Sequence, residues 1–266
     1  MASSPPPIGA HVPRRDPLGE ARRRGAEVVQ INLSAPRNWA PPVTHGDEED
    51  RAASGLPLFV HAPYLVNPAS PDPEVRARSR RCLELEAAAA ARVGARGLVV
   101  HAGQAGVGAT PDDAIDRWVD TMRGARLPCR LLLENTAGGD VAPGRTPADL
   151  GRLVGALRQL GLDVGIVLDT CHAHAAGLDL DSVVKELADA VGNIDLVHAN
   201  DSHDPAGSGR DHHQHLGCGE IDPDTLAAAA LAPGAPVVVE TPGGAEAQAG
   251  DVEWLRARVR TAPPAT

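Results

Sequence analysis

The sequence predicts a single-domain α/β protein, a (β/α)8 TIM barrel, and three observations support this fold class. The chain has 266 residues, and such barrels routinely use about 250 residues as one unit. Eight short apolar runs alternate with helical segments from end to end, and eight βα units are the number that closes a barrel. An open doubly wound sheet usually carries a Gly-rich phosphate turn after its first strand. Here Pro13-Arg14-Arg15-Asp16 follows the first run instead, which favours the barrel.

The eight expected strands are short and rich in Val, Leu and Ile. Several are continuously apolar rather than alternating, as expected for parallel strands that are covered on both faces. In chain order they are Ile8–Val12, Val28–Leu33, Leu58–Pro63, Leu98–Ala102, Arg130–Asn135, Gly165–Thr170, Asp195–Asn200 and Pro236–Thr241.

Helix boundaries between these strands are marked by capping residues. A Thr or Asp followed by Pro is typical of a helix start, and a Gly is typical of its end. The start signals are Pro73, Thr110-Pro111, Thr146-Pro147 and Asp222-Pro223, the end signals are Gly94, Gly161 and Gly192, and Glu246–Val259 is expected to be the last helix.

Composition and the two chain ends indicate the domain organisation and the cellular location of the protein. Hydrophobic residues make up 42% of the chain, which excludes a disordered protein. We expect a disordered N-terminal extension over residues 1–7, one barrel domain over residues 8–260, and a flexible tail over residues 261–266. The start lacks an apolar signal core, and no apolar run approaches the ~18 residues of a membrane span. We therefore expect a soluble, cytoplasmic protein with no membrane partner.

The four cysteines show no CxxC spacing and no dense framework, which is typical of reduced thiols. They are Cys82, Cys129, Cys171 and Cys218. We interpret Cys171 and Cys218 as packing residues rather than ligands of a structural zinc ion, because they lack the paired spacing of such sites.

A His or a carboxylate ends six of the expected strands. In a parallel barrel every such strand end points to the same rim, where active sites are built. One such residue alone is more often a capped turn residue than a ligand, but six on one rim indicate a metal site. Mixed imidazole and carboxylate donors suit zinc, manganese or iron better than calcium or magnesium. The six residues are His61, His101, Glu134, Asp169, His198 and Glu240.

Two local clusters add further donors near that rim. His172 follows Asp169 by three residues, and Asp211 and His213 lie in a Gly-rich loop after the seventh expected strand. All three can reach the same rim as the strand ends. For His174, His212 and His215 the favoured interpretation is an exposed or merely supporting position.

Seven motifs, in order and at matching spacing, resemble those of the endonuclease IV family. They are HAPYLVNPASPD, VVHAGQ, LLLENTAGG, VLDTCHAHAAGLDL, LVHANDS, GSGRDHHQHLGCGEID and VVVET. The resemblance covers nearly the whole chain. It implies a TIM barrel with three zinc ions that acts as an apurinic/apyrimidinic (AP) endonuclease. Such an enzyme hydrolyses the phosphodiester bond 5′ to an abasic site in duplex DNA, in base excision repair, and leaves a 3′-hydroxyl and a 5′-deoxyribose phosphate.

The resemblance also assigns the metal ligands residue by residue, and none of the nine positions is substituted. The first zinc would be held by His61, His101 and Glu134, the second by Glu134, Asp169, His198 and Glu240, and the third by His172, Asp211 and His213. Glu134 would bridge the first two ions. Glu240 would help to orient or deprotonate the attacking water, so Glu134 and Glu240 are the expected catalytic carboxylates.

DNA contacts are implied for the loops after the early strands, which in the family wedge open the base stack at the lesion. The matching residues here are Arg37, Tyr64, Leu65 and Asn67. Between Asp211 and His213 the family commonly has arginine, whereas this chain has His212, which puts any phosphate contact by that arginine in doubt. The expected partner is double-stranded DNA with abasic sites, and the protein is expected to be a monomer.

The net charge of −10 argues against binding to nucleic acid through a basic field. Three Zn²⁺ ions would offset six of these charges at the place where DNA binds. Arginines also cluster at Arg14-Arg15 and over Arg76–Arg81, next to the rim loops. We therefore expect DNA binding that is local and sensitive to salt.

Two alternatives remain from the residues alone. A sugar isomerase or epimerase resembling xylose isomerase would use the same barrel with about two metal ions, but it would not need His172, Asp211 and His213. A non-catalytic protein that binds damaged DNA would use the same loops, although the intact ligand set argues against it.

Overall fold

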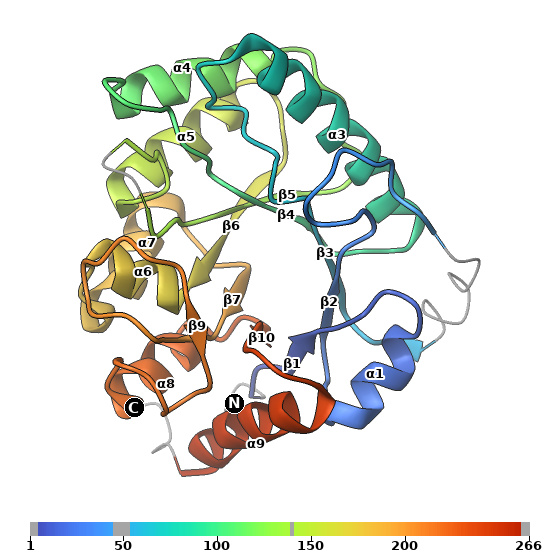
Figure 1. Ribbon diagram of the computed structural model, residues 1–266, viewed down its shortest axis with the longest axis vertical. Coiled ribbons are helices and arrows are strands. Elements are labelled where there is room, and N and C mark those ends of the chain that lie inside the picture. The colour runs from blue at the N-terminus through green and yellow to red at the C-terminus, as the bar shows by residue number, and fades with distance from the viewer. Residues whose placement is uncertain (1–4, 45–53, 139–140, 262–266) are drawn as a thin grey trace.

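The structure is a computed structural model that describes residues 5–44, 54–138 and 141–261, and within this part eight parallel strands form a closed barrel (Figure 1). The strand order around the barrel is β1-β10-β7-β6-β5-β4-β3-β2. The barrel strands are β1 (Ile8–His11), β2 (Val29–Ile31), β3 (Leu58–His61), β4 (Leu98–His101), β5 (Leu131–Glu134), β6 (Val164–Asp169), β7 (Leu196–His198) and β10 (Val237–Val239). All eight expected strands are present, with ends that differ from the expectation by at most two residues. The predicted fold class is confirmed.

Helices surround the barrel on its outer face, as Figure 1 shows. They are α1 (Pro17–Arg24), α3 (Pro73–Arg92), α4 (Pro111–Met122), α5 (Pro147–Gln159), α6 (Thr170–Ala176), α7 (Leu180–Val191), α8 (Pro223–Leu231) and α9 (Ala245–Thr261). The capping predictions hold: Thr110, Thr146 and Asp222 each accept a hydrogen bond from a backbone N–H in the first turn of the helix that follows.

Three short elements were not expected from the sequence. They are α1, which Asp16 and Gly25 cap, α6, which is only seven residues long, and a small antiparallel hairpin formed by β8 (Asp201–Ser202) and β9 (His213–Gln214). Helix α9 also reaches Thr261, the first residue of the expected tail. Residues 1–4 of the expected disordered extension and residues 262–266 of the expected tail lie outside the described residues. Pro7, the last residue of that extension, accepts the Val237 N–H at 2.9 Å.

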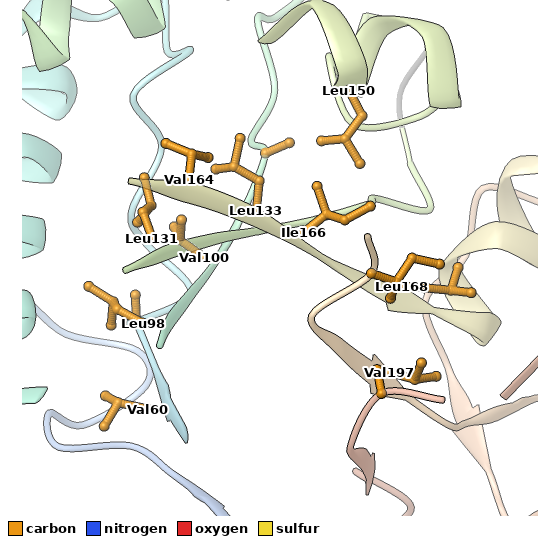
Figure 2. Packing of buried hydrophobic residues seen from close by; sticks show 14 of the residues in the cluster. Val60, Leu98, Val100, Leu131, Leu133, Leu150, Val164, Ile166, Leu168 and Val197 are labelled. Atoms are coloured by element: carbon orange, nitrogen blue, oxygen red, sulfur yellow. The ribbon is translucent and has the colours of Figure 1, made fainter. Parts of the chain in front are cut away.

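Two layers of apolar side chains hold the barrel together. One layer lies between the strands and the helices, where Leu133, Ile166 and Leu150 lie close together (Figure 2). The other fills the barrel interior with one side chain from each of seven strand segments: Val28, Phe59, Val99, Leu132, Val167, Leu196 and Val238. None of the helices in the described part of the chain combines the length and the apolar character needed to cross a membrane.

Candidate metal centre

A ring of eight polar side chains lies directly above the apolar layer of the barrel interior. Because successive side chains of a strand point to opposite faces, the residue two positions after an interior side chain also points inward. Counting two residues on from the seven interior residues gives Gln30, His61, His101, Glu134, Asp169, His198 and Glu240, and counting from Gly9 on β1 gives His11. All six strand-end residues expected from the sequence therefore lie in this ring, and Gln30 and His11 complete it.

The predicted ligands approach one another in the sets expected from the sequence. Glu134 is fully buried at the centre, with Oε2 3.2 Å from His61 Nε2 and 3.2 Å from His101 Nε2. Its other oxygen, Oε1, lies 2.9 Å from His198 Nδ1. Four groups have donor atoms that lie within 4.8 Å of one another, and three of them match the expected sets: His61, His101 and Glu134; Glu134, Asp169, His198 and Glu240; and His172, Asp211 and His213. The fourth group, Asp169, Cys171 and His213, was not expected and overlaps the second and third sets.

The third group is built from α6, β9 and the loop before β9 rather than from barrel strands. Asp169 caps α6 by accepting the N–H of His172 at 2.7 Å, which turns the His172 ring over the rim. The hairpin of β8 and β9 brings His213 opposite Ser202. Asp211 then lies between the two rings, with Oδ2 3.1 Å from His172 Nε2 and Oδ1 3.0 Å from His213 Nε2. Two elements that the sequence did not reveal thus place the third donor set.

The buried Asp201 carboxylate organises the His-rich loop. It accepts hydrogen bonds from the backbone N–H groups of Gly217, Gly219 and Ile221 at 2.9–3.1 Å. A Cβ at Gly219 would lie 2.3 Å from the Ser202 carbonyl oxygen, so the loop can pass this close only with glycine there. Asp201 was not predicted as a site residue, although it lies within the LVHANDS motif.

Four groups of the centre, His198, His213, Glu134 and Glu240, have pKa values that their neighbours shift strongly. Burial alone would lower the pKa of His198, but the Glu240 and Glu134 carboxylates outweigh it and raise that pKa to about 9. Burial also opposes the rise in the pKa of His213, which the Asp211 and Asp169 carboxylates bring to about 9. Burial would raise the pKa of Glu134 and Glu240, yet the neighbouring histidines hold both well below the usual range. Buried charges in this number are stable only when each is paired with an opposite charge or binds a metal ion.

The orientation of the histidine rings fits metal ligation. His61 Nδ1 lies 2.7 Å from the Ala62 carbonyl oxygen and His172 Nδ1 lies 2.9 Å from that of Asn135, so each N–H donates outward. The opposite nitrogen of each ring faces the carboxylates, which is the arrangement of metal-binding histidines. The buried Nε2 of His213 makes no hydrogen bond although Asp211 Oδ1 is 3.0 Å away. With imidazole and carboxylate donors in groups of three or four, the centre fits zinc.

The residues expected to contact DNA lie beside this centre. A cavity of about 860 Å³ opens over Glu240 and His213 and is bordered by Arg37, Tyr64 and Leu65. Tyr64 is 63% exposed, and its ring meets His101 edge-on at 5.4 Å between centroids. An exposed tyrosine at this place is not packing the barrel top.

Asn67 and His212 have protein partners of their own. Both ends of the Asn67 amide bond the backbone of Gln104, at 2.9 and 3.1 Å, so this side chain ties the loops after β3 and β4 together. His212 Nδ1 lies 2.6 Å from Asp204 Oδ2, with 65% of the side chain exposed, and Arg210 approaches the same carboxylate at 3.3 Å.

The remaining histidines and cysteines mostly follow the expectation. His174 bonds the Asp204 carbonyl oxygen and His215 bonds Asp251, so both have supporting positions. Cys171 is buried, as a packing residue should be. Cys218, however, is exposed. The prediction that it packs was wrong: the residues on either side, Gly217 and Gly219, donate their N–H groups to the buried Asp201 carboxylate, and the Cys218 side chain between them is left on the surface.

Comparisons with known proteins agree with this architecture. Residues 18–258 match the family of xylose isomerase-like TIM barrels. A probable endonuclease 4 from Mycobacterium bovis is 44% identical over 251 residues, which cover 94% of this chain and 98% of the relative. The crystal structure of endonuclease IV from Thermus thermophilus has a TM-score of 0.83 at 33% identity and covers 97% of this chain and 100% of that chain.

A more distant likeness shows the fold alone. The crystal structure of a D-tagatose 3-epimerase-like protein has a TM-score of 0.78, but at 20% identity over 96% of this chain and 97% of that chain. The match to endonuclease 4 is closer in sequence and spans nearly the full length of both chains. The chain belongs to the endonuclease IV family of xylose isomerase-like TIM barrels.

Proposed function

We propose that this protein is a zinc-dependent AP endonuclease. It hydrolyses the phosphodiester bond 5′ to an abasic site in duplex DNA and leaves a 3′-hydroxyl and a 5′-deoxyribose phosphate, as a cytoplasmic monomer in base excision repair. The observation that carries this proposal is the third donor group. His172, Asp211 and His213 lie together beside the Glu134-centred groups, and a sugar isomerase with about two metal ions would not need them.

The nine donors have distinct roles in the proposal. His61, His101 and Glu134 would hold one zinc ion, and Glu134, Asp169, His198 and Glu240 a second. His172, Asp211 and His213 would hold a third. When bound, zinc supplies positive charge to the reacting phosphate and makes water acidic enough to attack near neutral pH.

Two carboxylates are the expected catalytic groups of the chain itself. Glu134 presents one oxygen to His61 and His101 and the other to His198, which allows it to bridge two sites. Glu240 borders the open cavity and is 17% exposed at its side chain, so it can reach the attacking water and orient it or accept its proton. No covalent intermediate is needed.

DNA recognition would rest on the loops that border the cavity. Tyr64 and Leu65 project from the loop after β3, and the Tyr64 N–H donates to the Pro36 carbonyl oxygen at 2.8 Å, which couples that loop to the one carrying Arg37. A coupled pair of loops can enter the minor groove and hold an extruded nucleotide. Extrusion requires the least free energy where a base is missing, because stacking is already lost there. Asn67 would contact the backbone from the same loop, and His212 would contact it from the loop before β9.

The proposal is tested with a duplex that carries one tetrahydrofuran abasic analogue, which resists β-elimination. The zinc-loaded protein should cut 5′ to the analogue, and a DNA polymerase should extend the new 3′ end. Glu240→Gln removes a charge but little volume, so it should lower incision by at least about 10²-fold while most binding to the duplex remains.

Three outcomes would count against the proposal. Binding without incision by the zinc-loaded wild type would favour a non-catalytic DNA-binding protein. Epimerisation of a ketose without incision would favour the sugar-epimerase alternative. Parallel loss of binding and incision in Glu240→Gln would mean that this residue only holds the centre together.

A further inference from the structure

Gln30 is the one uncharged amide in the polar ring, and it contacts two of the predicted ligands directly. It is fully buried on β2. Its Nε2 donates to Glu240 Oε1 at 2.6 Å, and its Oε1 lies 2.9 Å from His198 Nε2. The same Nε2 lies 3.0 Å from His11 Nδ1. Two ring residues, Gln30 and His11, belong to none of the donor groups in the described part of the chain. Of these two, Gln30 is the one that hydrogen-bonds both His198 and Glu240.

The hydrogen-bond pattern permits only one orientation of this amide. The Glu240 carboxylate can only accept, so the end of Gln30 that lies 2.6 Å from Glu240 Oε1 is its NH₂ group. The oxygen of Gln30 then receives the N–H of His198 Nε2 at 2.9 Å. The reversed amide would face its oxygen toward the Glu240 carboxylate and its NH₂ toward the His198 N–H. In the first arrangement both ends of the Gln30 amide have a suitable partner.

This arrangement leaves particular atoms of both ligands pointing at the centre. With Nε2 of His198 bonded to Gln30, its Nδ1 is the nitrogen that faces Glu134 Oε1 at 2.9 Å and Glu240 Oε2 at 3.5 Å. With Oε1 of Glu240 bonded to Gln30 and 3.0 Å from His11, Oε2 is the oxygen left for ligation.

We propose that Gln30 is the positioning residue of the second zinc site: it fixes the ring nitrogen that His198 offers to the metal and restricts Glu240 to ligation through one oxygen, Oε2. This inference rests on the metal assignment of the proposed function. Residues that orient a ligand from outside the donor set commonly change metal affinity or activity by about 10- to 100-fold when they are replaced. His11 packs against the same pair, with Nδ1 3.0 Å from both Gln30 Nε2 and Glu240 Oε1.

The test uses the zinc-loaded, full-length protein and the variant Gln30→Met, which keeps the length of the side chain but has neither the donor nor the acceptor. Gln248→Met is the matched control. Gln248 is also a buried glutamine with both ends bonded, but its hydrogen-bond partners are Arg24 and the Thr241 carbonyl oxygen rather than a predicted ligand side chain. Zinc release into a chromogenic chelator is followed over time, and incision of the abasic duplex is measured at saturating DNA.

Gln30→Met should release one zinc equivalent about 10- to 100-fold faster than the wild type, while the other equivalents leave at wild-type rates. Its kcat should fall and its affinity for the abasic duplex should persist. Gln248→Met should release zinc like the wild type, even if its melting temperature falls. Gln30→Glu keeps an acceptor toward His198 but sets a carboxylate against Glu240, so it should also accelerate release of that equivalent.

Wild-type zinc release and wild-type kcat in Gln30→Met would overturn the proposal. Equal acceleration of every equivalent, or an equal effect in Gln248→Met, would do the same, because it would indicate general loosening of the barrel. Zinc release does not require DNA. Failure of the AP endonuclease proposal would appear as absent incision by the wild type, whereas failure of this inference would leave wild-type incision intact.

Discussion

Each strand of the barrel ends in one inward polar residue, and the identity of that residue decides what the rim can do. Six of the eight are predicted metal ligands, and they are brought within 4.8 Å of one another in two groups that share Glu134. Burial of the Glu134 carboxylate is tolerated because three imidazoles, those of His61, His101 and His198, lie against its two oxygens. A cation is the group best suited to such a cluster.

Zinc binding should release protons from the metal-free protein. The carboxylates raise the pKa values of His198 and His213 to about 9, so both rings are protonated near pH 7.5 when no metal is bound. A zinc ion must displace those protons. Calorimetric titrations in two buffers with different ionisation enthalpies should therefore show net proton release at pH 7.5, and zinc affinity should rise with pH up to about pH 9. Binding without proton release at pH 7.5 would contradict the histidine assignment.

His212→Arg tests the position where the chain departs from its family. The His212 imidazole is bonded to Asp204 and largely exposed, and imidazole is charged only in acid solution whereas guanidinium is charged throughout. If this position contacts a DNA phosphate, the variant should bind an abasic duplex more tightly at pH 8 by about 1 kcal/mol or less and steepen the salt dependence by up to about one unit. Fluorescence anisotropy across salt at pH 6 and pH 8 measures both. If His212→Arg and the wild type show the same salt dependence of binding at pH 6 and at pH 8, His212 does not contact the DNA.

At the scale of elements, the barrel strands determine which residues face the centre and how far along the barrel axis they lie. Because side chains alternate, the interior apolar residue fixes which residue two positions later faces the centre. Strand β1 follows the same rule with Gly9 in place of an apolar side chain. A Cβ at Gly9 would lie 1.7 Å from the Val28 carbonyl oxygen, so β1 and the start of β2 approach too closely for any larger residue.

Gly9→Ala should therefore lower the free energy of unfolding by at least about 2 kcal/mol, since a fixed backbone atom occupies the space of the new methyl group. Gly155→Ala is the control. Gly155 lies in α5 with no atom within 4 Å of an added Cβ, so this change should stabilise the protein by up to about 1 kcal/mol. Urea unfolding of both variants measures the difference. A Gly9→Ala protein as stable as the wild type would show that the two strands are farther apart.

The sequence predicted the elements with a strong periodic signal and missed those without one. Continuous apolar runs revealed all eight barrel strands, and Thr110 and Thr146 marked their helices. Helix α6 was not predicted because it is short and begins directly after β6, so no periodic pattern marks it. The hairpin of β8 and β9 was not predicted because each of its strands has only two residues.

The same limit applies to the candidate site. Its six strand-end donors were visible because each interrupts an apolar run. Gln30 interrupts Val28-Val29 and Ile31 in the same way, so a signal was present. Its role depends on contacts with His198 and Glu240, 168 and 210 positions away, which only barrel closure reveals.

At the scale of the whole molecule, closure of the barrel joins the two ends of the chain at the site. Strand β1 pairs with β10, and His11 lies 3.0 Å from Glu240, although 229 positions separate them in the sequence. Packing of α1 against α9 closes the outer ring beneath this junction (Figure 1). The site therefore exists only in the complete barrel.

The net charge of −10 makes DNA binding depend on the metal centre rather than on the whole surface. Several of the arginines expected to help are engaged elsewhere: Arg76 donates to the Ser70 and Pro71 carbonyl oxygens, and Arg80 to those of Thr121 and Arg123. Under the proposed function, positive charge at the rim would then come chiefly from zinc. The predicted ligands Glu240 and His213 and the loop residues Arg37, Tyr64 and Leu65 border one cavity, which fits that proposal.

The most direct measurement is a zinc titration of the metal-free protein in which bound zinc and incision of a tetrahydrofuran duplex are determined at every step. Three donor groups predict that incision rises steeply with the last equivalent and reaches its maximum at about three zinc ions per chain, at roughly three to four donors per ion. Full incision at two or fewer bound zinc ions would contradict the role of His172, Asp211 and His213, and with it the three-metal account of this site.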